Sequence, residues 1–91
     1  MMNRLTDSEI SDRLRSLEGW EVRDSRLVKS FKFKDFMSAV HFVDEIAPLA
    51  EAEGHHPDLQ VGWGNVVVEL TSHDAGGLTE KDFEVAARLP R

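Results

Sequence analysis

The sequence predicts an α+β fold, in which a four-stranded, mostly antiparallel sheet carries helices packed on one face. Two observations lead to this prediction. Segments whose apolar residues recur every three or four positions alternate with segments in which every second residue is apolar, in the order α-β-β-α-β-β-α. Cap and turn residues separate these segments, and the chain of 91 residues has no repeat or linker, so we expect a single domain over residues 1–91.

Capping residues mark the starts of the three expected helices. These residues, with their partners where a capping box forms, are Thr6 with Glu9, Asp35, and Thr79 with Asp82. The helices run from these caps to about residues 17, 53 and 89. Glycine follows the first two helices, as expected at a helix C-terminus. The four strands are expected over residues 20–23, 27–33, 58–63 and 66–72.

The turn between the last two strands determines which of their residues face each other. Gly64 and Asn65 suit a two-residue turn with positive φ. In that register the apolar residues of both strands pair on one side, and Trp63 is interpreted as part of this core-forming face. Continuing the ladder places His56 opposite His73. A slip by two residues would preserve the apolar face but separate these histidines, and only the turn residues argue against it.

Three of the four histidines lie in or beside this hairpin and suggest proton-transfer chemistry. Histidine exchanges protons near neutral pH because its unperturbed pKa is about 6.5. His55 directly precedes His56, and a glycine before them lets the backbone depart from strand geometry. Two carboxylates enter the same region: Glu51, from the last turn of the long helix, and Asp82. The remaining histidine, His41, is interpreted as a surface residue.

A zinc site is the alternative interpretation of these histidines. Three imidazoles can bind zinc while a carboxylate orients them, a part that Glu51 or Asp82 would take. Adjacent histidine side chains diverge and rarely hold one ion together. The sequence therefore favours acid–base chemistry over a metal centre.

Composition weighs against several other functions. The net charge is −6 and no basic run is present, which argues against binding nucleic-acid phosphates. The chain has no cysteine, so disulfides and thiolate nucleophiles are excluded. The charged first 16 residues do not resemble a signal peptide, and no apolar run approaches the roughly 20 residues of a membrane helix. We therefore expect a cytoplasmic protein with no membrane partner.

The spacing of these residues resembles the signature of the pterin-4a-carbinolamine dehydratases, also called 4a-hydroxytetrahydrobiopterin dehydratases. The residues that carry the resemblance are Glu51, His55, His56, Pro57, Trp63, His73 and Asp82. Residues 71–83 are similar to the family almost throughout, and the resemblance extends over about residues 20–89. The sequence departs from many relatives at Leu59, where an aromatic residue is common, and at Trp63, where tyrosine is common.

The resemblance implies dehydration of 4a-hydroxytetrahydropterin to quinonoid dihydropterin, which recycles the cofactor of aromatic amino acid hydroxylases. It implies no metal or organic cofactor. His55 and His73 would act as general acids on opposite faces of the pterin, one for each 4a epimer, while His56 would bind the ring and assist as base. The other residues of the motif would bind the substrate or orient the imidazoles: Glu51, Pro57, Trp63 and Asp82.

The resemblance also implies a homodimer or homotetramer, which would add to a core that is small in a chain of this length. A different class of function stays open beside the enzyme. Animal members of the family bind a transcription factor through a helical surface, so the chain is alternatively a protein-binding or dimerisation module. A complete set of histidines would be unnecessary in that role, which favours the enzyme.

Overall fold

The computed structural model describes residues 3–90, so residues 1, 2 and 91 of the expected domain lie outside the described part. The helices and strands follow the predicted order α-β-β-α-β-β-α, and the predicted α+β class is confirmed. Their bounds are α1 Asp7–Leu14, β1 Glu21–Arg23, β2 Arg26–Lys32, α2 Phe36–Glu53, β3 Asp58–Val61, β4 Asn65–Leu70 and α3 Glu80–Arg88. A short 3₁₀ helix, η1 His73–Ala75, lies between β4 and α3 and was not predicted.

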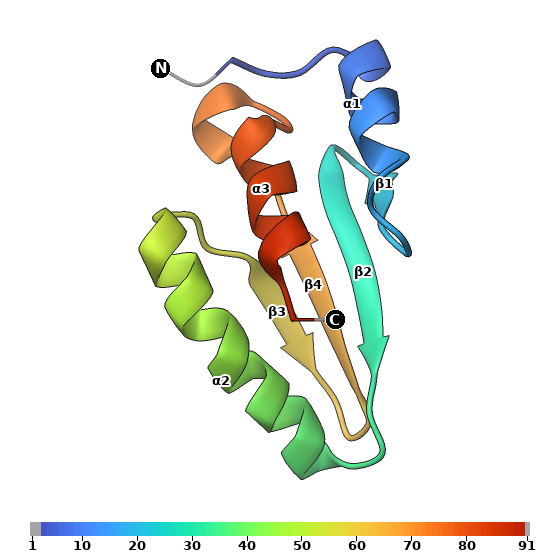
Figure 1. Cartoon of the computed structure of the whole chain (residues 1–91), viewed down its shortest axis with the longest axis vertical. Helices are drawn as coiled ribbons and strands as arrows, with labels where there is room; N and C mark the ends of the chain where they lie inside the picture. Colours follow the sequence, from blue (N-terminus) through green and yellow to red (C-terminus); the bar gives the residue numbers. More distant parts are fainter. Residues whose placement is uncertain (1–2, 91) are drawn as a thin grey trace.

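The four strands form one antiparallel sheet in the order β1-β2-β4-β3. Helices α2 and α3 lie over the same face of this sheet (Figure 1). The central strands bury the residues that point toward these helices, among them Leu27, Phe31, Val66, Val68 and Leu70. The alternation of apolar residues therefore predicted correctly which face of the sheet is buried.

Aromatic side chains fill the space between β2 and α2. Phe42, which is 1% exposed, lies with its ring centroid 4.6 Å from that of Phe31 and 5.1 Å from that of Phe33. Trp20 meets the edge of Phe31 at 6.1 Å. Lys29 interrupts the apolar face in sequence, but its ammonium group lies over the Phe31 ring and donates to the carbonyl of Glu18. Phe42 thereby packs α2 against the sheet, together with the other buried residues of the helix, Ala39, Ile46 and Ala50.

The predicted register of the β3–β4 hairpin is wrong by two residues. Val61 pairs with Val66 and Leu59 pairs with Val68, so the chain reverses at residues 63 and 64 instead of 64 and 65. This is the slip that keeps the apolar face intact. In this register the ladder, if continued past β3, would bring Thr71 and not His73 opposite His56.

The cause of the shift is the pairing of β4 with β2. Phe33 donates its N–H to the carbonyl of Gly64, which extends the β2–β4 ladder by one residue beyond Lys32 and Asn65. Gly64 therefore lies in the ladder and lacks the positive φ that the predicted turn requires. Trp63 is left at the hairpin tip and is 72% exposed, so its interpretation as a core residue is wrong.

The predicted caps at the starts of the helices are confirmed, whereas α1 ends at Leu14, before the expected residue 17, with Arg15 and not a glycine as its C-cap. Capping boxes start α1, with Thr6 and Glu9, and α3, with Thr79 and Asp82. Asp35 accepts a hydrogen bond from the backbone N–H of Ser38 at the start of α2. Within residues 3–90 no helix combines the length and the apolar character needed to cross a membrane.

Candidate active site

The C-terminus of α2 places His55 and His56 beside the sheet. Gly54 adopts a left-handed conformation, with φ of 63°, and ends the helix. Its N–H donates to the carbonyl of Glu51, and the N–H of His55 donates to the carbonyl of Ala50. These two bonds form a Schellman motif, which fixes the backbone of the residue that follows the glycine. The departure from strand geometry that the sequence required before the histidines is therefore made at Gly54.

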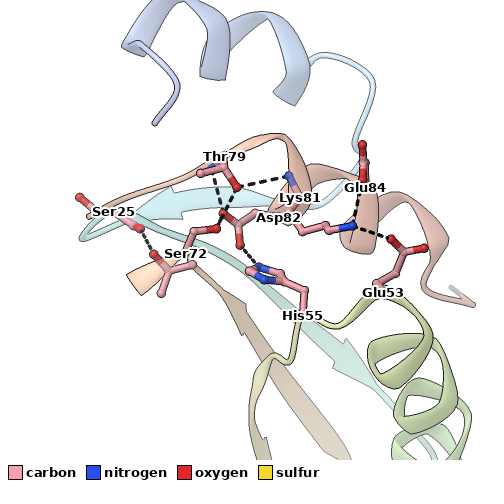
Figure 2. Close-up of polar contacts among 9 residues, drawn as sticks. Ser25, Glu53, His55, Ser72, Thr79, Lys81, Asp82 and Glu84 are labelled. Carbon is pink, nitrogen blue, oxygen red and sulfur yellow. Dashed lines mark hydrogen bonds and ion pairs between the residues drawn. The ribbon is translucent and has the colours of Figure 1, made fainter. Parts of the chain in front are cut away.

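A buried carboxylate holds the His55 ring. Nε2 of His55 lies 2.5 Å from Oδ1 of Asp82, and Asp82 is fully buried. The other carboxylate oxygen, Oδ2, accepts from the Ser72 hydroxyl at 2.8 Å and from the Thr79 backbone N–H at 2.9 Å. Figure 2 shows these residues converging from the segment after α2, the segment after β4 and the start of α3. The His55 side chain is 12% exposed, so its ring is largely fixed by this network.

His73 reaches the same region through a loop that follows β4, and not by cross-strand pairing with His56 as predicted. After β4 the chain enters η1, and a bridge between Ser72 and Gly77 closes this loop. Gly76 supports the loop with a φ of 74°. The loop folds back toward the end of α2, and His73 becomes a wall of the cavity that His55 and His56 line. The three histidines therefore meet, although His56 and His73 are not cross-strand partners.

The cavity between these walls has a volume of about 310 Å³. This lies at the lower end of the range for small-molecule pockets. Its lining residues are Gly54, His55, His56, Thr71, Ser72, His73 and Asp74. The sequence did not single out Thr71, Ser72 or Asp74. Their positions next to His73 are the signal that could have identified them, because residues beside a site residue usually share its surroundings.

His56 pairs with the other predicted carboxylate. Its Nε2 contacts Oε2 of Glu51, and both side chains are mainly exposed. An exposed pair of this kind contributes little stability. His56 and Pro57 also line an apolar hollow of about 230 Å³ between α2 and β3, with Ala47 and Leu59 among its other residues. The hollow adjoins the histidine cavity through His56, which lines both.

Two features of the chain lie apart from this site. Trp63 is at the tip of the β3–β4 hairpin, at the opposite end of β3 from His56, and does not line the cavity. A larger hollow, of about 430 Å³, lies between α1 and the η1–α3 connection, and no histidine lines it. We take the cavity lined by His55, His56 and His73 as the candidate active site because the residues able to transfer protons gather there.

Ion pairs fasten α3 to the end of α2 beside the site. Glu53 accepts from Lys81 at 3.3 Å and also contacts Arg88. The hydrogen bond from Lys81 and the positive charges of both partners lower the pKa of the Glu53 carboxyl. Figure 2 shows the Glu53–Lys81 pair next to the His55–Asp82 contact. Glu53, Lys81 and Arg88 thus form a clamp that joins α3 to the end of α2, next to His55 and Asp82.

The geometry suits general acid–base catalysis. Two of the imidazoles are each held by a carboxylate, and His73 is exposed at the cavity wall. Side chains able to donate or accept protons thus come from more than one wall of the cavity. Within the described residues no group of three or more histidine, cysteine or acidic side chains is arranged to hold a metal ion. Residues 3–90 therefore provide no set of ligands for the zinc site considered as an alternative.

Comparison with known sequences gives a consistent set of relatives. Residues 3–91 match the family described as pterin 4 alpha carbinolamine dehydratase. A relative from Roseiflexus sp. (strain RS-1) is 48% identical, over 98% of this chain and 96% of its own. A relative from Sulfolobus acidocaldarius is also 48% identical, over 94% of each chain. Both are named provisionally as pterin-4-alpha-carbinolamine dehydratases.

Solved structures share the fold. A Brucella melitensis protein described as a transcriptional coactivator/pterin dehydratase superposes with a TM-score of 0.91 and 40% identity, over 96% of this chain and 95% of its own. A pterin dehydratase-like protein, identified as a RuBisCO assembly factor in the alpha-carboxysome, gives a TM-score of 0.66 and 28% identity. That match covers 79% of this chain and 86% of the other.

Proposed function

The chain belongs to the pterin 4 alpha carbinolamine dehydratase family of enzymes, and we propose that it dehydrates 4a-hydroxytetrahydrobiopterin to quinonoid dihydropterin. The observation that supports this proposal is the convergence of His55, His56 and His73 on one cavity, with two of them paired to carboxylates. The product would return to the tetrahydropterin pool used by aromatic amino acid hydroxylases.

The reaction needs one proton donor and one proton acceptor. The bond between C4a and its hydroxyl oxygen breaks, and the hydroxyl leaves as water after it receives a proton. The neighbouring ring nitrogen loses its proton, and its electron pair forms the new C=N bond. The reaction neither gains nor loses protons overall, but it leaves the acid histidine one proton short and the base histidine with one extra. Exchange with solvent restores both before the next turnover.

We assign the acid role to His55 and His73, which come from different walls of the cavity, and the ring-binding and base role to His56. Asp82 and Glu51 orient the rings of His55 and His56 through the contacts described above. Pro57 supports His56 and adjoins the apolar hollow. Trp63 has no part in this site within one copy of the chain, because it lies at the hairpin tip.

The test follows the decay of enzymatically generated 4a-hydroxytetrahydropterin by stopped-flow absorbance. We expect the native protein to accelerate the decay, and His55→Ala and His73→Ala each to lose about 10²- to 10⁴-fold in rate. With separated 4a epimers, each substitution should slow one epimer more than the other. His41→Ala is the matched control, because His41 is an exposed residue of α2 that does not line the cavity. Decay at the spontaneous rate with native protein would contradict the proposed function.

We place this reaction in the cytoplasm and expect it to need no metal or organic cofactor. Cell fractionation tests the location. Elemental analysis of active protein, before and after chelation, tests the cofactor. Activity that followed the content of bound metal would contradict this part of the proposal.

A role as a protein-binding module is the second candidate. It is supported by four large apolar side chains that are exposed at one end of the molecule: Phe36, Met37, Val61 and Trp63. This end contains the start of α2 and the β3–β4 hairpin tip, away from the histidines (Figure 1). Patches of this kind often mark interfaces. A stoichiometric protein partner recovered with a chain that lacks dehydratase activity would favour this role.

We propose that the same end contributes to a homodimer or homotetramer. Light scattering coupled to size-exclusion chromatography measures the mass of the native assembly, and Met37→Lys with Trp63→Ser should reduce it. Glu45→Lys, on an exposed face of α2, is the control. A monomeric native protein would refute the oligomer. An assembly that persists in the double variant would refute the placement of its interface at this end of the molecule.

A further inference from the structure

The buried hydroxyl groups of Ser72 and Thr79 form a hydrogen-bonded chain that ends on Asp82, the carboxylate that contacts His55. Ser72 is 3% exposed and Thr79 is 1% exposed. Their side-chain oxygens lie 2.8 Å apart, and Ser72 Oγ lies 2.8 Å from Oδ2 of Asp82. A buried hydroxyl costs free energy unless it is hydrogen-bonded. Both hydroxyls must therefore keep positions in which these hydrogen bonds form.

The direction of the hydrogen bonds follows from counting donors. A serine hydroxyl has one hydrogen. Ser72 gives it to the carboxylate, so in the Ser72–Thr79 contact the threonine donates and the serine accepts. Thr79 Oγ1 in turn accepts from the backbone N–H of Lys81 at 3.3 Å. Successive donors therefore point toward Asp82, and such chains strengthen each member.

The carboxylate of Asp82 must accept from His55 as well. Oδ2 already has two donors, the Ser72 hydroxyl and the Thr79 N–H, and this pattern suits the ionised form, which only accepts. The contact between Oδ1 and Nε2 of His55 then requires a hydrogen on Nε2. Nδ1 is left as the ring nitrogen that can exchange a proton with a ligand.

Ser72 also belongs to the opposite wall of the cavity. Its backbone pairs with Gly77 and closes the loop that carries His73, the next residue along the chain. Its side chain reaches the start of α3, where Asp82 holds His55 (Figure 2). One residue thus joins the wall that presents His73 to the carboxylate that holds His55.

We propose that Ser72 is a positioning residue for the dehydration: its hydroxyl fixes Asp82, and through it the tautomer and orientation of His55, relative to His73. This inference rests on the proposed function. It assigns no contact between Ser72 and the reacting atoms. The hydroxyl of Ser72, and not the packing of its side chain, is what positions His55 and thereby affects kcat.

The kinetic test compares Ser72→Ala with Ser72→Thr, which keeps the hydroxyl. We expect Ser72→Ala to lower kcat by about 10- to 150-fold, the size associated with one hydrogen bond to a charged group. KM should change by less than about 3-fold, because the residue acts on the reacting geometry and not on uniform binding. Ser72→Thr should recover most of kcat. Ser30→Ala, on the exposed side of β2, is the matched control.

A second measurement does not depend on activity. Nitrogen NMR of the His55 imidazole, in its neutral form and without substrate, reports which ring nitrogen carries the hydrogen. We expect the Nε2–H tautomer in native protein, and a mixture of tautomers in Ser72→Ala. If native protein lacks dehydratase activity, the proposed function fails while this spectrum still tests the network.

Three results would overturn the inference. The first is an Nδ1–H tautomer of His55 in the native protein, which needs no variant to fold. The second is a folded Ser72→Ala with native kcat and tautomer. The third is a folded Ser72→Thr as impaired as Ser72→Ala, which would show that packing and not the hydroxyl matters.

Discussion

Replacing Asp82 with asparagine is the sharpest test of how the site is built. The substitution preserves the shape of the buried side chain and removes its charge. The amide oxygen can still accept from the Ser72 hydroxyl and the Thr79 N–H. The amide nitrogen then faces His55 and donates to Nε2, which reverses the direction of that hydrogen bond.

The size of the effect follows from the contacts. Loss of one hydrogen bond to a charged group costs about 1.5–3 kcal/mol, which is about 10- to 150-fold in rate at 1.36 kcal/mol per tenfold. The reversed bond also imposes the wrong tautomer, which raises the loss further, so we expect kcat to fall by about 100-fold or more. Asp82→Ala is a poorer choice, because it would remove three hydrogen bonds, about 4.5–9 kcal/mol, from a total stability of about 5–15 kcal/mol.

Stopped-flow decay of the 4a-hydroxypterin measures the rate, and circular dichroism during heating measures the fold. A loss of about 1.5–3 kcal/mol should lower Tm by about 6–24 °C, which leaves a folded protein at room temperature. Glu84→Gln is the control, because it makes the same acid-to-amide change on the exposed side of α3. A folded Asp82→Asn that keeps more than about one third of native kcat would refute the role of the carboxylate.

Three further predictions concern stability. Phe42→Ala should cost about 3–5 kcal/mol in chemical denaturation, whereas Phe36→Ala, at a side chain that is 49% exposed, should cost less than about 1 kcal/mol; equal losses would contradict the packing described. Glu53→Gln should destabilise the fold at neutral pH, and the difference from native protein should shrink in acid; a difference independent of pH would contradict the clamp. The sign follows because the hydrogen bond from Lys81 lowers the folded-state pKa of Glu53, so its contribution is present above the ordinary glutamate pKa and is lost as pH falls through the lowered value. Gly54→Ala should cost about 1–2 kcal/mol, since its φ of 63° is unfavourable for alanine although no atom blocks the added Cβ; a neutral effect on the urea midpoint would argue against the left-handed cap.

The order of the elements and the helix starts could be predicted because they depend on short-range physics. A capping box needs a hydroxyl and a carboxylate three residues apart, and Thr6 with Glu9 and Thr79 with Asp82 meet that requirement in any fold. The buried face of the sheet follows from alternation alone, which is why it survived the wrong register. The unpredicted η1 has only three residues and follows from turn geometry that apolar periodicity does not report.

The sequence by itself identified the three histidines of the candidate site, the two carboxylates that contact them and the glycine that precedes the two adjacent histidines. Only the tertiary structure decided how they meet. The β3–β4 register depends on the ladder between β4 and β2, a strand more than thirty residues earlier, and a hairpin considered alone cannot contain that pairing. His73 joins the site through a loop closed by Ser72 and Gly77, while Asp82 becomes a buried acceptor because α3 packs against the end of α2. These contacts join segments far apart in sequence, so their geometry is fixed by packing of the whole domain and not by local pattern.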